Sequence, residues 1–278
     1  MVLKVVAAKT AQRTNQTMAD LADRHELYEA AVQNVAEQCS FIDYIFKQTR
    51  GRKALSFRED FCGTASASCE WARFGNAHYA FGVDLDPEVL EWGREHRISE
   101  LTKLQQQRVS LTCGNVLEVE TPLVDVVGAF NFSYWSFATR SDLLRYFKTT
   151  HENLVADGMF FLDAYGGADS FTELQEKMAI EDFIYVWDQA RYCPVTGQMQ
   201  THIHFEFPDG SSLQNAFSYN WRLWTLAEIR EALAEAGFRD STVWFEFLDD
   251  NGEGLGEWYP ESEGDAVAAW VANITAMK

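Results

Sequence analysis

The sequence predicts an α/β protein: a doubly wound, mostly parallel seven-stranded sheet with N-terminal helices and an inserted antiparallel β-sheet. Short apolar runs alternate with helical segments from residue 54 to residue 163, as in parallel sheets covered on both faces. Three longer β-like runs then follow one another between residues 183 and 224. The 278 residues are 47% hydrophobic and 14% aromatic, which is enough to bury a large core.

Charge and hydropathy limit the partners of the chain. It carries 23 basic and 42 acidic residues, a net charge of −19 that repels a polyanion. We therefore expect a small-molecule substrate and no nucleic acid. No stretch reaches the roughly 20 continuous apolar residues of a membrane span, and the opening MVLKVVAAKTAQRT lacks the long apolar core of a signal peptide. A cytoplasmic protein without membrane contact is expected, and assembly into homo-oligomers stays open.

The first half of the chain is expected to place helices before an α/β core. Apolar side chains at helical spacing over residues 17–48 predict one or two helices within an N-terminal lid segment, 1–52. The α/β core is expected over residues 53–182. Its strands are expected at 54–57, 79–84, 109–113, 124–130 and 159–163, and its helices at 68–73, 88–92 and 141–156. Asp86 and Pro87 provide the N-cap and first turn of the second of these helices.

Residues 183–224 are expected to form the antiparallel insertion, on the substrate side. Turn signals lie at 194–197 and 208–210. In the middle run, apolar side chains at odd positions alternate with polar side chains that include His202 and His204, as a half-buried strand requires.

The remaining residues, 225–278, are expected to complete the core. A capping box at Thr225 predicts a helix that ends at Gly237. The runs 241–248 and 268–275 are expected to be closing strands, although the second fits a helix equally well. The acidic segment between them is expected to be a mobile loop.

The stretch REDFCGTAS, residues 58–66, follows the first expected strand. A turn that leads from a parallel strand into a helix points backbone N–H groups at the ligand site of a doubly wound fold. A dinucleotide loop, G-x-G-x-x-G, needs three glycines, and this stretch has only Gly63. A nicotinamide-dependent oxidoreductase is therefore a poor fit.

The stretch resembles the first motif of the class I S-adenosylmethionine-dependent methyltransferases, an acidic residue followed by G-x-G-x-G. Cys62-Gly63-Thr64 matches its centre, while Phe61 and Ala65 stand at the other two glycine positions. The segment 221–238 is similar to the tail of small-molecule N-methyltransferases of the glycine and aminosugar type. The resemblance covers residues 54–278 and implies a Rossmann-like fold.

This resemblance implies S-adenosylmethionine as cofactor and S-adenosylhomocysteine as product. Asp84, at the end of the second strand, is implied to bind the ribose hydroxyls, and Asn115 the adenine amine. Asn131 matches the place near the transferred methyl. The cofactor-binding residues implied are Glu59, Cys62, Gly63, Ala65, Asp84, Leu85, Asn115, Val116 and Asn131.

Candidates for acceptor binding and proton transfer are less sharply defined. The candidate general bases are His25, Tyr165, His202 and Tyr219. The candidate substrate contacts are Tyr28, Tyr134, Trp135 and Arg222. Arg222 suits a substrate carboxylate but also suits an ordinary surface position, and His25 and Tyr28 suit either a lid or simple helix packing.

Two alternatives remain at this point. One is a metal site. His202, His204 and Glu206 share a strand face that fits it, but a solvated polar face is favoured and no metal is expected. The five cysteines do not add to such a site, because they have no CxxC spacing and are expected to be reduced thiols. The altered glycine loop also leaves open a catalytically silent module that binds S-adenosylmethionine or a partner.

Overall fold

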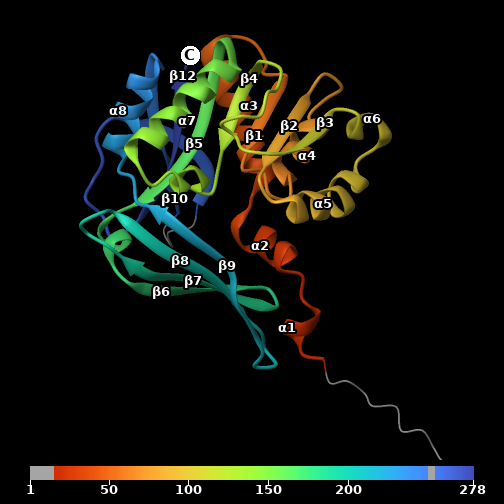
Figure 1. The fold of residues 1–278 in the computed structure, drawn as a ribbon, viewed down its shortest axis with the longest axis vertical. Coiled ribbons are helices and arrows are strands. Elements are labelled where there is room, and N and C mark those ends of the chain that lie inside the picture. Colours follow the sequence, from red (N-terminus) through yellow and green to blue (C-terminus); the bar gives the residue numbers. More distant parts are fainter. Residues whose placement is uncertain (1–15, 250–253) are drawn as a thin grey trace, which may run out of the picture.

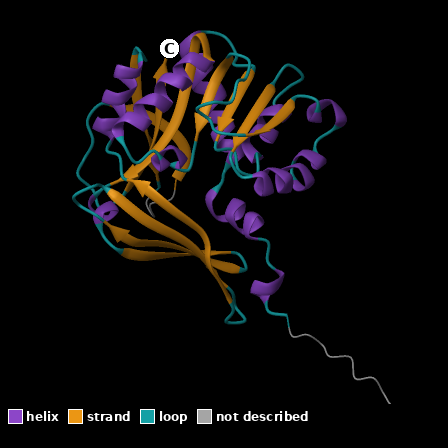
Figure 2. Ribbon diagram, viewed as in Figure 1, coloured by secondary structure: helices purple, strands orange, loops and turns teal. Residues whose placement is uncertain are grey.

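The computed structural model describes residues 16–249 and 254–278, which form two β-sheets and the helices around them (Figure 2). The strands of the larger sheet are β1 (Ser56–Asp60), β2 (Tyr79–Asp84), β3 (Val109–Cys113), β4 (Val124–Ala129), β5 (Leu154–Gly166), β10 (Asp240–Leu248), β11 (Gly254–Glu261) and β12 (Trp270–Met277). Those of the smaller sheet are β6 (Leu174–Ile180), β7 (Phe183–Tyr192), β8 (Gln198–Glu206) and β9 (Ser212–Arg222). The opening segment considered for a signal peptide lies outside the described residues.

Helices cover the larger sheet and precede it (Figure 1). They are α1 (Met18–Leu21), α2 (Arg24–Val32), α3 (Val35–Arg50), α4 (Ser66–Arg73), α5 (Pro87–His96), α6 (Lys103–Gln106), α7 (Arg140–Asn153) and α8 (Leu226–Ala236). Short 3-10 turns are η1 (Ile98–Glu100), η2 (Ser133–Ser136) and η3 (Ala168–Phe171). The predicted capping box of α8 is confirmed, since the Thr225 side chain accepts from the Glu228 N–H and Gly237 ends the helix with φ 110°. In the described residues, no helix is both long and apolar enough to cross a bilayer.

The larger sheet confirms the doubly wound prediction and adds a strand to it. Its order is β11-β10-β12-β5-β4-β1-β2-β3, and the strands from β5 to β3 in this order are all parallel. β12 is antiparallel to both of its neighbours, β5 and β10, so the final apolar run is a strand and not a helix. The smaller antiparallel sheet begins at β6, before the start expected at residue 183.

The expected mobile loop after β10 was wrong for residues 254–261, because β11 adds an eighth strand there. Aromatic side chains within the acidic segment explain this. The Tyr259 ring lies 4.4 Å from Phe247 on β10, and the Trp258 ring lies 5.4 Å from Phe41 on α3. Cross-strand and core contacts of this kind stabilise a strand in spite of its charge.

Both faces of the larger sheet are buried, as a parallel sheet requires. All residues of β4 are buried. On one face, Leu143 and Phe147 of α7 and Leu233 of α8 belong to one core cluster. On the other face, Phe46 of α3 and Trp71 of α4 belong to a second cluster. The carboxyl ends of β1, β2 and β4 are thereby held rigidly at one edge.

The N-terminal helices join the smaller sheet to the core (Figure 1). The backbone N–H of Met18 donates to the Asp209 carboxylate at 2.8 Å, which attaches α1 to the turn between β8 and β9. Leu27 and Tyr28 of α2 pack against the cluster that contains Phe205. The smaller sheet is therefore connected to the core through α2 as well as through its own strands.

Candidate functional site

The loop after β1 keeps the backbone of a glycine-rich turn although two of the glycines are replaced. Phe61, Gly63 and Ala65 have φ values of 58°, 51° and 61°. This left-handed region costs a non-glycine residue about 1–2 kcal/mol. The Phe61 ring turns toward α7, where it lies 5.6 Å from the Tyr146 ring. A Cβ added at Gly63 would meet no described atom within 4 Å, so the loop faces open space there.

Asp84, at the end of β2, is joined directly to this loop. Its Oδ2 accepts a hydrogen bond from the Gly63 N–H at 2.8 Å, and its Oδ1 accepts from the Asp86 N–H at 2.9 Å. A carboxylate offers about four acceptor positions, so two remain for a ligand. The structure thus brings together the two positions on which the predicted cofactor site most depends.

Glu59 and Cys62 have interior positions beside the loop. The Glu59 carboxylate accepts from the Ser68 N–H at 2.8 Å and from the Ser68 hydroxyl at 2.6 Å, which anchors α4. Burial raises the pKa of Glu59 to about 7. Burial also raises the pKa of the Cys62 thiol, which is 3% exposed. A buried thiol with a raised pKa is a poor nucleophile.

Three more of the predicted cofactor-binding residues follow the ends of β2 and β3. Leu85 is exposed at the sheet edge, whereas Val116 is buried. Asn115 Oδ1 accepts from the Leu117 N–H at 3.0 Å, which leaves its side-chain NH2 group and a second lone pair available. The Val116 carbonyl accepts from Arg58 at 2.8 Å, and this bond fixes the segment after β3 against β1.

The turn after β4 carries Asn131 and adds a residue that the sequence analysis missed. Asn131 and Phe132 have φ values of 53° and 56°. Their N–H groups donate to the two carboxylate oxygens of Asp163 on β5, at 2.7 Å and 2.8 Å. Burial raises the pKa of Asp163 to about 7, against these two bonds, which lower it. The available signal was a polar residue at the end of the apolar run 159–163.

A cavity of about 1550 Å3 opens between the larger sheet and the smaller one. Four predicted residues line it: Tyr28, Asn131, Tyr165 and Tyr219. Aromatic rings form much of its wall, from Phe132, Tyr185, Trp187, Trp221, Phe245, Trp258, Tyr259 and Trp270. The cavity therefore begins at the turn after β4 and continues toward β10 and β11.

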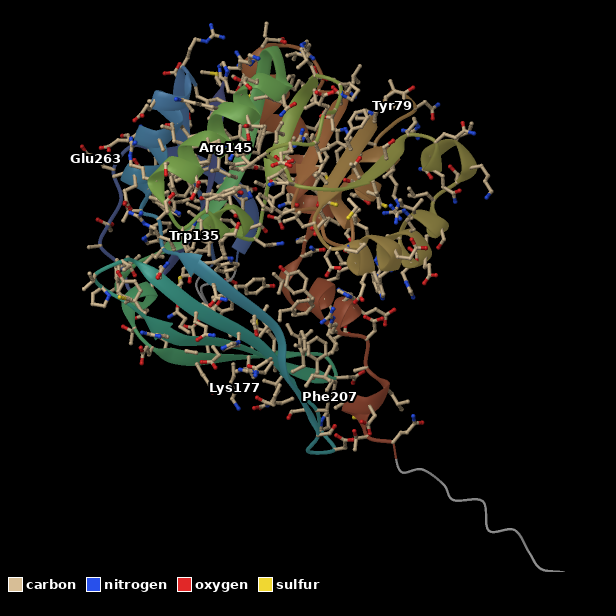
Figure 3. All side chains as sticks on the ribbon, viewed as in Figure 1. Tyr79, Trp135, Arg145, Lys177, Phe207 and Glu263 are labelled. Atoms are coloured by element: carbon tan, nitrogen blue, oxygen red, sulfur yellow. The ribbon has the colours of Figure 1, made fainter. Side chains whose placement is uncertain are left out.

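Tyr134 and Trp135 are fully buried behind this wall instead of lining it. The Trp135 ring lies 4.8 Å from Tyr165 and 6.2 Å from Trp221. Figure 3 shows Trp135 where the two sheets meet. Trp135 thus packs against two rings of the cavity wall. Neither Trp135 nor Tyr134 lines the cavity, so the structure does not support the prediction that they contact the substrate.

His202 and Arg222 lie away from the cavity. Ile203 lines the cavity, so its neighbour His202 points to the opposite face of β8, where its ring nitrogen lies 2.7 Å from the Ser218 hydroxyl. Arg222 forms an ion pair with Glu228 at 3.0 Å and stacks 3.7 Å from the Trp224 ring centroid. The described residues hold no group of His, Cys, Asp and Glu that suits a metal ion.

The other candidate bases differ in position and in protonation. His25 lies between the rings of Trp92 and Phe217, at 5.2 Å and 5.8 Å, and burial lowers its pKa. Burial raises the pKa of Tyr219 to about 12 and the pKa of Tyr165 still higher. Both tyrosines are therefore protonated near neutral pH, and in this form they are weak bases.

Solved structures of methyltransferases resemble this chain over nearly its whole length. A methyltransferase from Clostridium acetobutylicum that depends on S-adenosylmethionine has 15% identity and a TM-score of 0.67, over 91% of this chain and 96% of that one. The fold is that of the S-adenosylmethionine-dependent methyltransferases. An amino pentose methyltransferase from Micromonospora echinaspora has 13% identity and a TM-score of 0.63, over 91% and 95%. A sugar N-methyltransferase from Streptoalloteichus has 15% identity and a TM-score of 0.60, over 97% and 98%. No family model and no curated protein matches the sequence.

In this methyltransferase fold, hydrogen bonds to the Glu29 carboxylate hold α2 beside the loop after β1. Glu29 accepts from the hydroxyls of Thr64 and Ser66, each at 2.5 Å, and from Arg97 at 2.7 Å. Asp23 at the start of α2 accepts from the Trp92 indole N–H at 2.6 Å. Sequence spacing gave no signal for these contacts, because they join residues far apart in the chain. A lid function for α2 stays a prediction.

Gly93 of α5 allows this helix to approach the loop of the methyltransferase fold. A Cβ at Gly93 would lie 2.5 Å from the Thr64 carbonyl oxygen. Gly93→Ala is expected to lower the free energy of unfolding by about 1–2 kcal/mol, because overpacking outweighs the gain of about 1 kcal/mol in helix propensity. Urea denaturation measures this, with exposed Glu95→Ala on the same helix as the control. An increase in the free energy of unfolding would show that the loop moves away from the added methyl group without losing stability.

Proposed function

We propose that this protein transfers the methyl group of S-adenosylmethionine to a small-molecule acceptor. The observation that carries the proposal is the 2.8 Å bond between the Gly63 N–H and the Asp84 carboxylate. It places a carboxylate suited to ribose hydroxyls beside a loop with exposed space, at the carboxyl edge of a doubly wound sheet. Ligands of such sheets bind at this edge.

The residues at this edge fit the cofactor. The open space at Gly63 admits a ligand close to the backbone, and the two unused acceptor positions of Asp84 match two vicinal hydroxyls. Asn115 retains donors and an acceptor for the adenine ring. Asn131 lines the cavity and follows β4, the neighbour of β1, so it would lie between the bound cofactor and the cavity. Bound S-adenosylmethionine would supply an electrophilic methyl group on a positively charged sulfur.

The chain's own contribution is then positioning and exclusion of water. Holding the acceptor atom in line with the methyl group can lower the barrier by about 7–11 kcal/mol. The aromatic wall of the cavity suits this purpose, and the protonated hydroxyl of Tyr219 can donate to a polar atom of the substrate, whereas that of Tyr165 already donates to Gln189 at 3.3 Å. A nucleophile that arrives with a free lone pair needs no strong base.

Nitrogen is the acceptor atom that the cavity favours. The described lining includes two cationic side chains, Lys177 and Arg230, and five carboxylates, from Glu176, Glu246, Glu261, Glu263 and Asp265. Lys177 is already paired with Glu206 at 2.7 Å. Acidic and aromatic surroundings attract the ammonium form of an amine. The bound ammonium must release one proton to solvent before its nitrogen has the lone pair that attacks the methyl group. Two of the similar structures are named for an amino pentose and for a sugar nitrogen as acceptors, which agrees with an amine.

Calorimetric titration tests the cofactor assignment without an acceptor. S-adenosylmethionine and S-adenosylhomocysteine are expected to bind saturably, and NAD, the negative control, is not. Amine, alcohol and thiol acceptors are then compared by formation of S-adenosylhomocysteine, with amines expected to react. Binding without turnover of any acceptor would favour the catalytically silent module instead, and the absence of binding would remove the proposal.

A further inference from the structure

One carboxylate fixes the turn between β4 and η2. Asp163, on β5, accepts from the Asn131 N–H at 2.7 Å through Oδ2 and from the Phe132 N–H at 2.8 Å through Oδ1. The carbonyl oxygen of Asp163 also accepts from the Tyr134 hydroxyl at 2.7 Å. Asp163 therefore binds the turn at its start and again within η2.

The turn needs such a partner because its backbone is unfavourable without one. Asn131 and Phe132 are consecutive non-glycine residues in the left-handed region, with φ values of 53° and 56°. Residues in this conformation persist when the surrounding structure specifies them, and they gather at functional sites. Two N–H groups that point in one direction form a concave anion site, which the Asp163 carboxylate fills.

The conformation of this turn decides what faces the cavity. Both Asn131 and Phe132 line the cavity. The Phe132 ring lies 4.8 Å from Tyr165 and 5.4 Å from Trp135, so it forms part of the aromatic wall. If the turn relaxed to an ordinary backbone, the Asn131 side chain and the Phe132 ring would leave these positions together.

We propose that Asp163 is a positioning residue, which holds the Asn131–Phe132 turn in the left-handed conformation that the cofactor site requires. This inference rests on the proposed function. Asp163 is 9% exposed and each of its carboxylate oxygens already accepts a backbone N–H. It therefore acts on the bound cofactor through Asn131 and not by contact.

Asp163→Asn tests the role of the carboxylate. The asparagine side chain has one oxygen, so its NH2 group would face one of the two backbone N–H donors. At pH 8, we expect the affinity for S-adenosylhomocysteine, measured by calorimetry, to fall about tenfold because a buried donor loses its partner. Asp125→Asn is the control for loss of a buried carboxylate far from the turn. The Asp125 Oδ2 atom accepts from the N–H groups of Leu55 and Ser56 at 2.7 Å and 3.0 Å, and its Oδ1 atom is paired with Arg52 at 2.8 Å. That variant is expected to lower Tm but to leave the affinity unchanged.

Phe132→Gly, combined with Asp163→Asn, shows whether Asp163 holds the turn in its left-handed conformation or only contributes to overall stability. Glycine adopts the left-handed conformation without steric cost, so Phe132→Gly should reduce the effect of Asp163→Asn to less than about threefold. If the single variant does not fold while the combined variant does, that rescue supports the proposal. The proposal is overturned if folded Asp163→Asn binds like the wild type, if its effect is equal in both backgrounds, or if neither variant folds. If the wild-type protein does not bind S-adenosylhomocysteine, the proposed function is rejected instead.

Discussion

Replacing Arg58 with alanine is expected to lower the free energy of unfolding by about 3–5 kcal/mol, because the change leaves a buried carboxylate without its partner. Arg58 and Asp60 are 1% and 2% exposed, and their ion pair spans 2.7 Å. Arg58 also donates to the carbonyls of Val116 and Val119, at 2.8 Å and 3.1 Å. Urea denaturation followed by tryptophan fluorescence measures the loss.

An exposed ion pair provides the comparison for Arg58. Arg94 and Glu91 lie 2.9 Å apart on α5, with side chains 42% and 61% exposed. Exposed pairs contribute less than about 1 kcal/mol, so Arg94→Ala should change stability little. Adding Asp60→Asn to Arg58→Ala should restore part of the loss, because it removes the unpaired charge. If Arg58→Ala cost no more than Arg94→Ala, the interior around β1 would have to admit water.

Arg58 also illustrates what the sequence could predict and what it could not. The alternation of apolar runs correctly predicted the strands from β1 to β5 and their parallel direction, but it ended the first strand at residue 57, whereas β1 continues through Arg58 to Asp60. These predictions depend on local spacing alone. The carbonyl groups that accept from Arg58 lie 58 and 61 positions further along the chain, and no local pattern identifies them.

The smaller sheet gives a second example of a tertiary property that local sequence patterns do not predict. Alternation in β8 correctly separated an apolar face from a polar one, but it did not say which face borders the cavity. Since polar residues suggested chemistry, His202 and Arg222 were expected at the site. The structure turns the apolar face of β8 to the cavity, so aromatic residues such as Trp187 and Trp221 line it instead. Which face is buried depends on how the smaller sheet packs, and that is a tertiary property.

The loop after β1 shows that a backbone conformation typical of glycine can form where the glycine motif is incomplete. Two missing glycines suggested an altered site, yet Phe61 and Ala65 keep left-handed backbones. The contacts of the Phe61 ring with Tyr146 and Phe137 help to offset this strain. Such compensation comes from α7 and from the residue that follows η2, both far along the chain. The glycine motif therefore describes the least strained way to build the turn and not the only one.

Asp84→Ala is expected to weaken the binding of S-adenosylmethionine and S-adenosylhomocysteine by about 100-fold or more. Charge-assisted hydrogen bonds contribute about 1.5–3 kcal/mol each, and the variant loses both proposed bonds to the ribose. It also frees the Gly63 N–H, which now donates to Asp84 at 2.8 Å, so the loop loses its anchor. Calorimetry gives the affinities. Asp84→Asn keeps one acceptor oxygen and should fall between the alanine variant and the wild type.

Asp86→Ala separates this effect from a general loss of structure. Asp86 lies two residues further on and caps α5, where its carboxylate accepts from the Glu88 N–H at 2.8 Å. Its loss should cost about 1 kcal/mol of stability and leave cofactor affinity intact. Equal affinity losses in the Asp84 and Asp86 variants would assign both effects to a displaced α5. Unchanged affinity in Asp84→Ala would mean that the ribose lies elsewhere, because a carboxylate that holds both hydroxyls cannot be removed without cost.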